Sequence, residues 1–156
     1  MSFRSFHGRR RGAGRFLAAA MLALAASSPA RAEIEPKYYR DWQMKAPEAL
    51  TIVPVSVRPV VTTGRPRSGE GLLIHTSVEA EAIVESVTRS ASGLKPGDSI
   101  RIEYKSTRAE PPAAGPRPIP VLKRGQPYPA FLLGVRKGLY APAARGASFE
   151  PLIELK

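Results

Sequence analysis

Apolar and polar residues alternate along two stretches in the middle of the chain. Small, branched or aromatic apolar residues take every second position there: Val78, Ala80, Ala82 and Val84 in residues 72–88, and Ile100, Ile102 and Tyr104 in residues 99–104. A period of two is typical of a β-strand with one buried face. The Glu and Ala residues of the first stretch also suit a helix, but its flanking β-branched residues favour a strand. The two stretches therefore predict an antiparallel pair, closed at 89–98 by a tight bend with Gly97 at positive φ and Asp98 as a turn residue.

Further segments of strand length flank this pair. Residues 51–61 alternate in the same way, and Pro54 and Pro59 favour an edge strand because proline cannot donate to a ladder. Apolar runs at 127–133, 139–143 and 149–155 add shorter strands. About five to seven short strands without a strong helix predict a mainly β fold. We expect a small antiparallel barrel, closed or half-closed and OB-like, with a β-sandwich as the alternative.

Two segments lack a strand pattern. Residues 33–49 predict an N-terminal arm that could hold one short helical turn, ahead of a single β domain at 50–156. The arm carries Tyr38, Tyr39 and Trp42, which either contact a partner or pack on the domain; packing is favoured, because a lone Trp usually lies at least half inside. Residues 106–120 hold five prolines and predict a solvent loop, in which Pro-Arg-Pro around Arg117 is a second candidate partner contact.

Residues 1–32 predict export. Five arginines and no acid occupy the first fifteen residues, an apolar run follows at 16–26, and Ala30-Arg31-Ala32 offers a small-x-small cleavage site. The run is too short to cross a ~30 Å hydrocarbon core, so a signal peptide is favoured over a retained helix. Its Ala/Arg-rich composition is typical of bacteria. We expect cleavage after Ala32 and a periplasmic or secreted protein, with the general secretory route preferred to the twin-arginine route.

Cleavage would change the charge of the protein. Six of the 24 basic residues lie in residues 1–32 and none of the 13 acidic ones does, so the net charge falls from +11 to +5. Acidic and basic residues interleave in the remaining chain, unlike the clustered basic face of a nucleic-acid binder. We expect no nucleic-acid partner and only a weak attraction to anionic surfaces.

Few residues could support catalysis. The chain has no cysteine, which excludes thiol chemistry, thiolate metal sites and disulfides. His75, the one histidine beyond residue 32, is interpreted as a half-buried strand residue rather than a catalytic base or metal ligand. The acidic set of 79, 81 and 85 could do acid–base work or bind a cation, but a solvated strand face offset by Arg101 and Lys105 is favoured. We therefore predict no catalytic residue, no metal and no cofactor, and expect a protein that is not an enzyme.

The order of elements resembles a known group of proteins. A long strand at 77–87 is followed by the Gly-Leu-Lys-Pro-Gly-Asp-Ser-Ile-Arg-Ile-Glu-Tyr segment at 93–104 and by Pro-Val-Leu-Lys-Arg-Gly-Gln-Pro-Tyr-Pro-Ala-Phe-Leu at 120–132, with Tyr140 and Ser-Phe-Glu at 148–150 completing the set. This layout is similar to small secreted bacterial proteins with an OB-like barrel, related in layout to netrin and tissue-inhibitor-of-metalloproteinase modules. The resemblance implies the barrel but no assigned activity. Glu33 stands where those inhibitors need an N-terminal cysteine, so metalloproteinase inhibition is not implied.

Two functions fit these observations. One is an exported binding or interaction module of the bacterial periplasm or envelope, which docks an unknown protein, peptide or glycan through a barrel face or an edge strand. The other is an envelope-associated accessory or structural protein that sits on an anionic surface through its charge and the aromatic arm. Neither the ligand nor the oligomeric state follows from the sequence.

Overall fold

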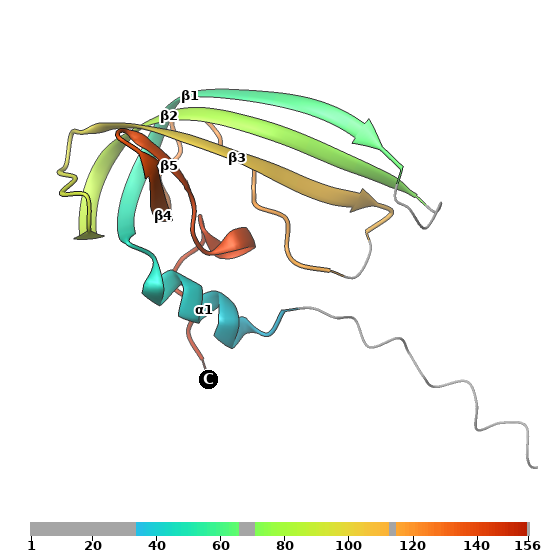
Figure 1. The fold of residues 1–156 in the computed structure, drawn as a ribbon, viewed down its shortest axis with the longest axis horizontal. Helices are drawn as coiled ribbons and strands as arrows, with labels where there is room; N and C mark the ends of the chain where they lie inside the picture. The colour runs from blue at the N-terminus through green and yellow to red at the C-terminus, as the bar shows by residue number, and fades with distance from the viewer. Residues whose placement is uncertain (1–33, 66–70, 113–114, 156) are drawn as a thin grey trace, which may run out of the picture. The chain divides into compact units, whose positions relative to one another are not determined.

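A computed structural model describes residues 34–65, 71–112 and 115–155, and the strands it contains close into a barrel (Figure 1). The barrel order is β1-β2-β3-β5-β4, and pairing of β4 with β1 closes the ring. The elements are α1 (Pro36–Lys45), β1 (Glu48–Gly64), β2 (Leu72–Ser90), β3 (Ser99–Glu110), β4 (Tyr128–Arg136), β5 (Leu139–Pro142) and the short 3-10 helix η1 (Arg145–Ala147). The prediction of a small, mainly β, OB-like barrel is confirmed, and the sandwich alternative is not adopted. One pair, β3 with β5, is parallel, so the sheet is mixed.

Three long strands supply most of the sheet. β1, β2 and β3 pair antiparallel over nearly their whole lengths, whereas β4 pairs with β1 only at Glu48–Ile52 and β5 pairs with β3 only at Arg101 and Ile102. The three long strands therefore run on past the barrel as an open three-stranded sheet (Figure 1). We call residues 58–64, 72–79 and 103–110 the extension.

The core follows the alternation seen in the sequence. Every second residue of β2 and β3 in the barrel is buried, and a single apolar cluster fills the interior: Leu50, Ile52, Ala80, Ala82, Val84, Ile100, Ile102, Leu122, Ala130, Leu132, Tyr140 and Phe149. This confirms a strand rather than a helix for residues 77–87. Tyr104 packs against the same cluster, and its hydroxyl donates to Pro120 O (2.8 Å) and accepts from Leu122 N (3.2 Å). Burial raises the pKa of Tyr104 to about 12.

The prolines of β1 lie where the strand has one neighbour. Residues beyond Ile52 pair with β2 alone, so the predicted edge begins at Val53; Thr51 and Ile52 pair on both sides. Pro54 O accepts a hydrogen bond from Gly125 N (2.8 Å), which places the nitrogen of Pro54 on the side away from β2. The register and the irregularity between Pro54 and Ser56 put the nitrogen of Pro59 on that side too. Neither proline therefore removes a bond from the ladder with β2.

Three segments differ from their predicted structure. The arm at 33–49 contains the ten-residue helix α1, which begins with Pro36 in its first turn, where the missing N–H costs no hydrogen bond. The predicted loop at 106–120 begins later, because β3 continues to Glu110. The predicted strand at 149–155 is irregular chain, and its backbone is held by a side chain of α1.

That side chain is Gln43, which is fully buried. Its Nε2 donates to the carbonyls of Ala147 (2.9 Å), Pro151 (3.1 Å) and Glu150 (3.3 Å), and its Oε1 accepts from Ile153 N (2.9 Å). Because one amide side chain satisfies these backbone groups, the segment needs no strand partner.

The predicted signal peptide, residues 1–32, lies outside the described residues, and so do its cleavage site and Glu33. Within the described ranges, no helix is long and apolar enough to cross a membrane.

Candidate functional site

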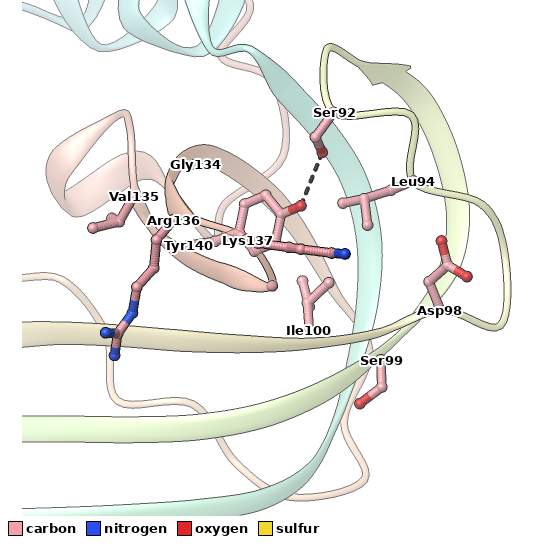
Figure 2. Close-up of a pocket in the computed structure, with 11 residues that line it drawn as sticks. Ser92, Leu94, Asp98, Ser99, Ile100, Gly134, Val135, Arg136, Lys137 and Tyr140 are labelled. Atoms are coloured by element: carbon pink, nitrogen blue, oxygen red, sulfur yellow. Dashed lines mark hydrogen bonds between the residues drawn. The ribbon is translucent and has the colours of Figure 1, made fainter.

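A hollow of the described surface lies at the barrel end away from the extension. It has a volume of about 550 Å³ and lies between the β2–β3 turn and the β4–β5 hairpin (Figure 2). We call it the end pocket. Its lining consists of Ser92, Leu94, Asp98, Ser99, Ile100, Gly134, Val135, Arg136, Lys137, Gly138 and Tyr140.

Two hydroxyl groups meet in the end pocket. Ser92 Oγ and Tyr140 OH lie 2.8 Å apart in a hydrogen bond, drawn as a dashed line in Figure 2. The backbone of Ser92 is itself fixed, because Ser92 N donates to Oε1 of the buried Glu48 (2.9 Å). The other oxygen of Glu48, Oε2, has no hydrogen-bond partner among the described residues. Tyr140 is 4% exposed, whereas Ser92 lies at the surface. The pair therefore links the barrel interior to the end pocket.

The charge of the lining is positive. Arg136 and Lys137 form the tip of the β4–β5 hairpin, are exposed, and have no ion pair or hydrogen bond within the described part of the chain. The single acid, Asp98, is already used in its turn, where Oδ2 accepts from Lys95 N (2.8 Å). Gly97 has φ +93°, which confirms the predicted bend and the structural role of Asp98.

Apart from Ser99, the remaining lining carries no polar side chain. Leu94 packs against the core cluster, Ile100 belongs to it, and Val135 is 58% exposed on the hairpin. Gly134 leaves space beside Tyr140: a Cβ built there would meet only the tyrosine ring, at 3.9 Å. The end pocket thus offers an apolar wall, hydroxyl groups and exposed cationic side chains, an arrangement that suits binding of a small ligand.

The four predicted partner contacts do not form one surface. Tyr39 is fully buried, packs edge-on against the half-buried Trp42 (5.5 Å between ring centroids) and accepts a hydrogen bond from Arg117 N (3.0 Å). The guanidinium of Arg117 lies over the Tyr39 ring and pairs with Glu150 (3.2 Å). Of the four, only Tyr38 is exposed, at 49%. Tyr39, Trp42 and Arg117 therefore join α1 to the barrel and the chain that follows it.

The other residues weighed from sequence lie on β2. His75 Nδ1 shares a hydrogen bond with Thr107 Oγ1 (2.9 Å) across to β3. The glutamates at 79, 81 and 85 are exposed, as predicted, but the offsetting charges differ: Glu79 pairs with Arg58 (3.5 Å), and Arg101 pairs with Glu103 (2.9 Å). Among the described residues, no three potential metal ligands lie together.

The sequence prediction missed the end pocket. Its hairpin reads Gly134-Val-Arg-Lys-Gly138, a basic doublet between two glycines, and that pattern marks an exposed charged turn. The contribution of Ser92 and Tyr140 depends on a contact between residues 48 positions apart, which no local pattern shows.

Comparison with known proteins adds no relative: no protein-family model, curated protein or solved structure matches the chain. The resemblance in layout to netrin-like modules therefore stays a prediction.

Proposed function

We propose that this chain is an exported, non-enzymatic binding module of the bacterial periplasm or envelope, and that the end pocket is its ligand site. The observation that carries the proposal is the pair of unpaired cations, Arg136 and Lys137, beside an apolar wall and a hydroxyl pair. The volume of the end pocket lies within the range of small-molecule sites. Export is supported by the basic, apolar and small-residue order of residues 1–32.

The alternative, attachment to an anionic surface through charge and aromatic residues, has less support. Tyr39 and Trp42 are engaged in packing within the molecule, which leaves Tyr38 as the exposed ring of the arm. Ionic attraction alone would be weak at physiological salt, where charges are screened beyond about 8 Å.

A filled pocket tests the proposal. Gly134→Leu places a side chain against Tyr140 where there is space for a Cβ, and Gly64→Leu adds the same side chain at the end of β1, where a Cβ would meet only His75 Nε2, also at 3.9 Å. We expect a crosslinked pull-down from envelope extracts to recover a defined partner or ligand with the wild type and with Gly64→Leu, and to lose it with Gly134→Leu. Equal recovery by all three proteins at high salt would contradict the proposal, and so would recovery that disappears for all three as salt rises.

A further inference from the structure

The end pocket carries information about the chemistry of its ligand. We propose that it binds an organic carboxylate on an apolar body, as in a free carboxylic acid or the carboxyl end of a peptide with an apolar last residue. This inference rests on the proposed function, because it takes the end pocket to be the ligand site.

Charge is the first argument. Some basic residues of the barrel and of its connections form ion pairs within the molecule: Arg101 with Glu103, Arg58 with Glu79 and Arg117 with Glu150. Others, such as the exposed Lys123 and Arg124, form none among the described residues. Arg136 and Lys137 are of this second kind and line the end pocket, where the acid Asp98 is held in its own turn. Two cations against one acid give the lining a net charge of +1, which matches a monoanion better than a dianion. A cationic ligand would be repelled at the hairpin tip.

Hydrogen bonding is the second argument. Ser92 and Tyr140 each have one hydroxyl proton, and one of these two protons is donated in the hydrogen bond between them. The other proton can be donated to an acceptor in the end pocket. The side chains of Arg136 and Lys137 carry hydrogen-bond donors only, so the end pocket favours a ligand rich in hydrogen-bond acceptors. Glu48 is a positioning residue in this account, because it accepts from Ser92 N and so fixes the Ser92 side of the pair.

The apolar wall is the third argument. Leu94, Ile100 and Val135 line the same hollow as the cations. Figure 2 shows Lys137 extended toward the side of Leu94, with Val135 and Arg136 projecting on the other side of the hairpin. An inorganic anion would pair with the cationic side chains but would leave the apolar residues exposed to water. A carboxylate attached to an apolar group would use both, because the apolar group removes exposed hydrocarbon from water.

A set of matched probes tests the inference on the full-length, isotope-labelled chain at neutral pH and low salt. The probes are phenylpropanoate, its neutral analogue phenylpropanamide, the cationic phenylpropylamine, and inorganic phosphate. Binding is followed by the amide chemical shifts of Ser92, Ser99, Gly134 and Gly138. We expect phenylpropanoate to bind about tenfold more tightly than the amide, because charge-assisted hydrogen bonds to Arg and Lys favour the carboxylate. The amine and phosphate should bind more weakly still.

Two double variants show which basic residues cause the preference for phenylpropanoate over phenylpropanamide. Arg136→Gln with Lys137→Gln should remove the tenfold difference. Lys123→Gln with Arg124→Gln, an equally exposed basic doublet in another turn, should retain it. N-Acetylphenylalaninate identifies the source of the carboxylate: tighter binding than phenylpropanoate supports a peptide end, and equal or weaker binding supports a free acid.

Three results would overturn the inference. Equal affinity for the acid and its amide would remove the role of charge, and phosphate binding as tightly as phenylpropanoate would remove the apolar body. In both cases the end pocket would still stand as a binding site. If no probe changed the four amide chemical shifts, the proposed ligand class would be wrong. The pull-down with Gly134→Leu would then test the proposed function independently.

Discussion

The same three strands behave differently at the two ends of the molecule. At the closed end, β4 and β5 complete the ring, Ile102 and Leu132 are fully buried, and α1 packs nearby through Tyr39 and Gln43. In the extension, β1, β2 and β3 continue with no fourth strand, and Val60 and Val61 are 62% and 60% exposed. In both parts successive side chains of a strand point to opposite faces of the sheet. What separates them is the short reach of β4 and β5.

This difference shows that alternation alone does not fix burial. A strand pattern predicts which residues share a face, but a face is buried only where another layer covers it. The closed end has that layer and an interior cluster. The extension keeps a sheet with open edges, and its β1 edge carries the exposed Pro59, which reduces pairing with other chains.

The largest expected effect comes from truncating the core of the closed end. Ile102→Ala should lower the free energy of unfolding by about 3 kcal/mol, because Ile102 is fully buried in the central cluster. Val60→Ala, which shortens an exposed side chain of the extension, should change it by less than about 0.5 kcal/mol. Urea unfolding of the full-length chain measures both. Similar losses for the two variants would show that the extension is covered in solution.

The link between α1 and the following chain should give the next largest effect. Gln43→Ala removes four hydrogen bonds to Ala147, Glu150, Pro151 and Ile153 and should cost about 2 kcal/mol, since some of these backbone groups lose their partner in a buried place. The exposed neighbour Met44 provides the control as Met44→Ala. Proteolysis within residues 149–155 should accelerate for Gln43→Ala only; unchanged protection there would mean that other contacts hold the segment.

Tyr104 lies at the boundary between the two parts and makes stability depend on pH. Burial holds its pKa at about 12 in the folded state, above the usual 10, so the unfolded chain loses this proton first. The stabilisation is therefore complete below about pH 10 and is lost as pH rises toward about 12. The free energy of unfolding should fall more steeply with pH across this range for the wild type than for Tyr104→Phe. Equal pH dependence in the two proteins would contradict the assignment of this effect to Tyr104. Tyr38→Phe, at an exposed ring, serves as the control.

The smallest expected change in folding stability concerns the extension edge. Pro59→Thr restores an N–H that faces away from β2, and it should alter the free energy of unfolding by less than about 1 kcal/mol while promoting self-association. Val60→Thr is the matched control, because its nitrogen faces β2 by the same alternation. Sedimentation at rising protein concentration distinguishes them. If Pro59→Thr sediments as the wild type does at every concentration, the proline does not guard the edge.

The sequence predicted the barrel because its strands carry a strong period of two. The alternating residues 78, 80, 82 and 84 placed the core face of β2 correctly, and Pro-Gly-Asp placed the turn before β3. Helix α1 was predicted as no more than one short turn because its buried face consists of Tyr39 and Gln43, one aromatic and one polar residue, which do not form an apolar stripe. Because Gln43 is polar, no sequence pattern indicated that its buried side chain would bind the backbone of the segment predicted as the final strand.

The candidate site was less accessible to prediction. The aromatic residues of the arm were predicted as possible partner contacts. In the structure, Tyr39 and Trp42 instead lie against each other and beside Arg117 and Arg145. The end pocket forms where the β2–β3 turn meets the β4–β5 hairpin, and that meeting follows from barrel closure. Only the isolated basic doublet at 136–137 could have indicated it from sequence.

The most direct measurement places a photo-crosslinking amino acid at Val135 or at Val60, two exposed valines of nearly equal exposure, 58% and 62%, at opposite ends of the molecule. Each variant of the full-length chain is irradiated in envelope extract and its adducts are identified by mass. If the end pocket is the ligand site, position 135 gives a specific adduct that excess wild-type protein suppresses, and position 60 gives none. A specific adduct at position 60 alone, or the same adduct at both positions, would contradict the account.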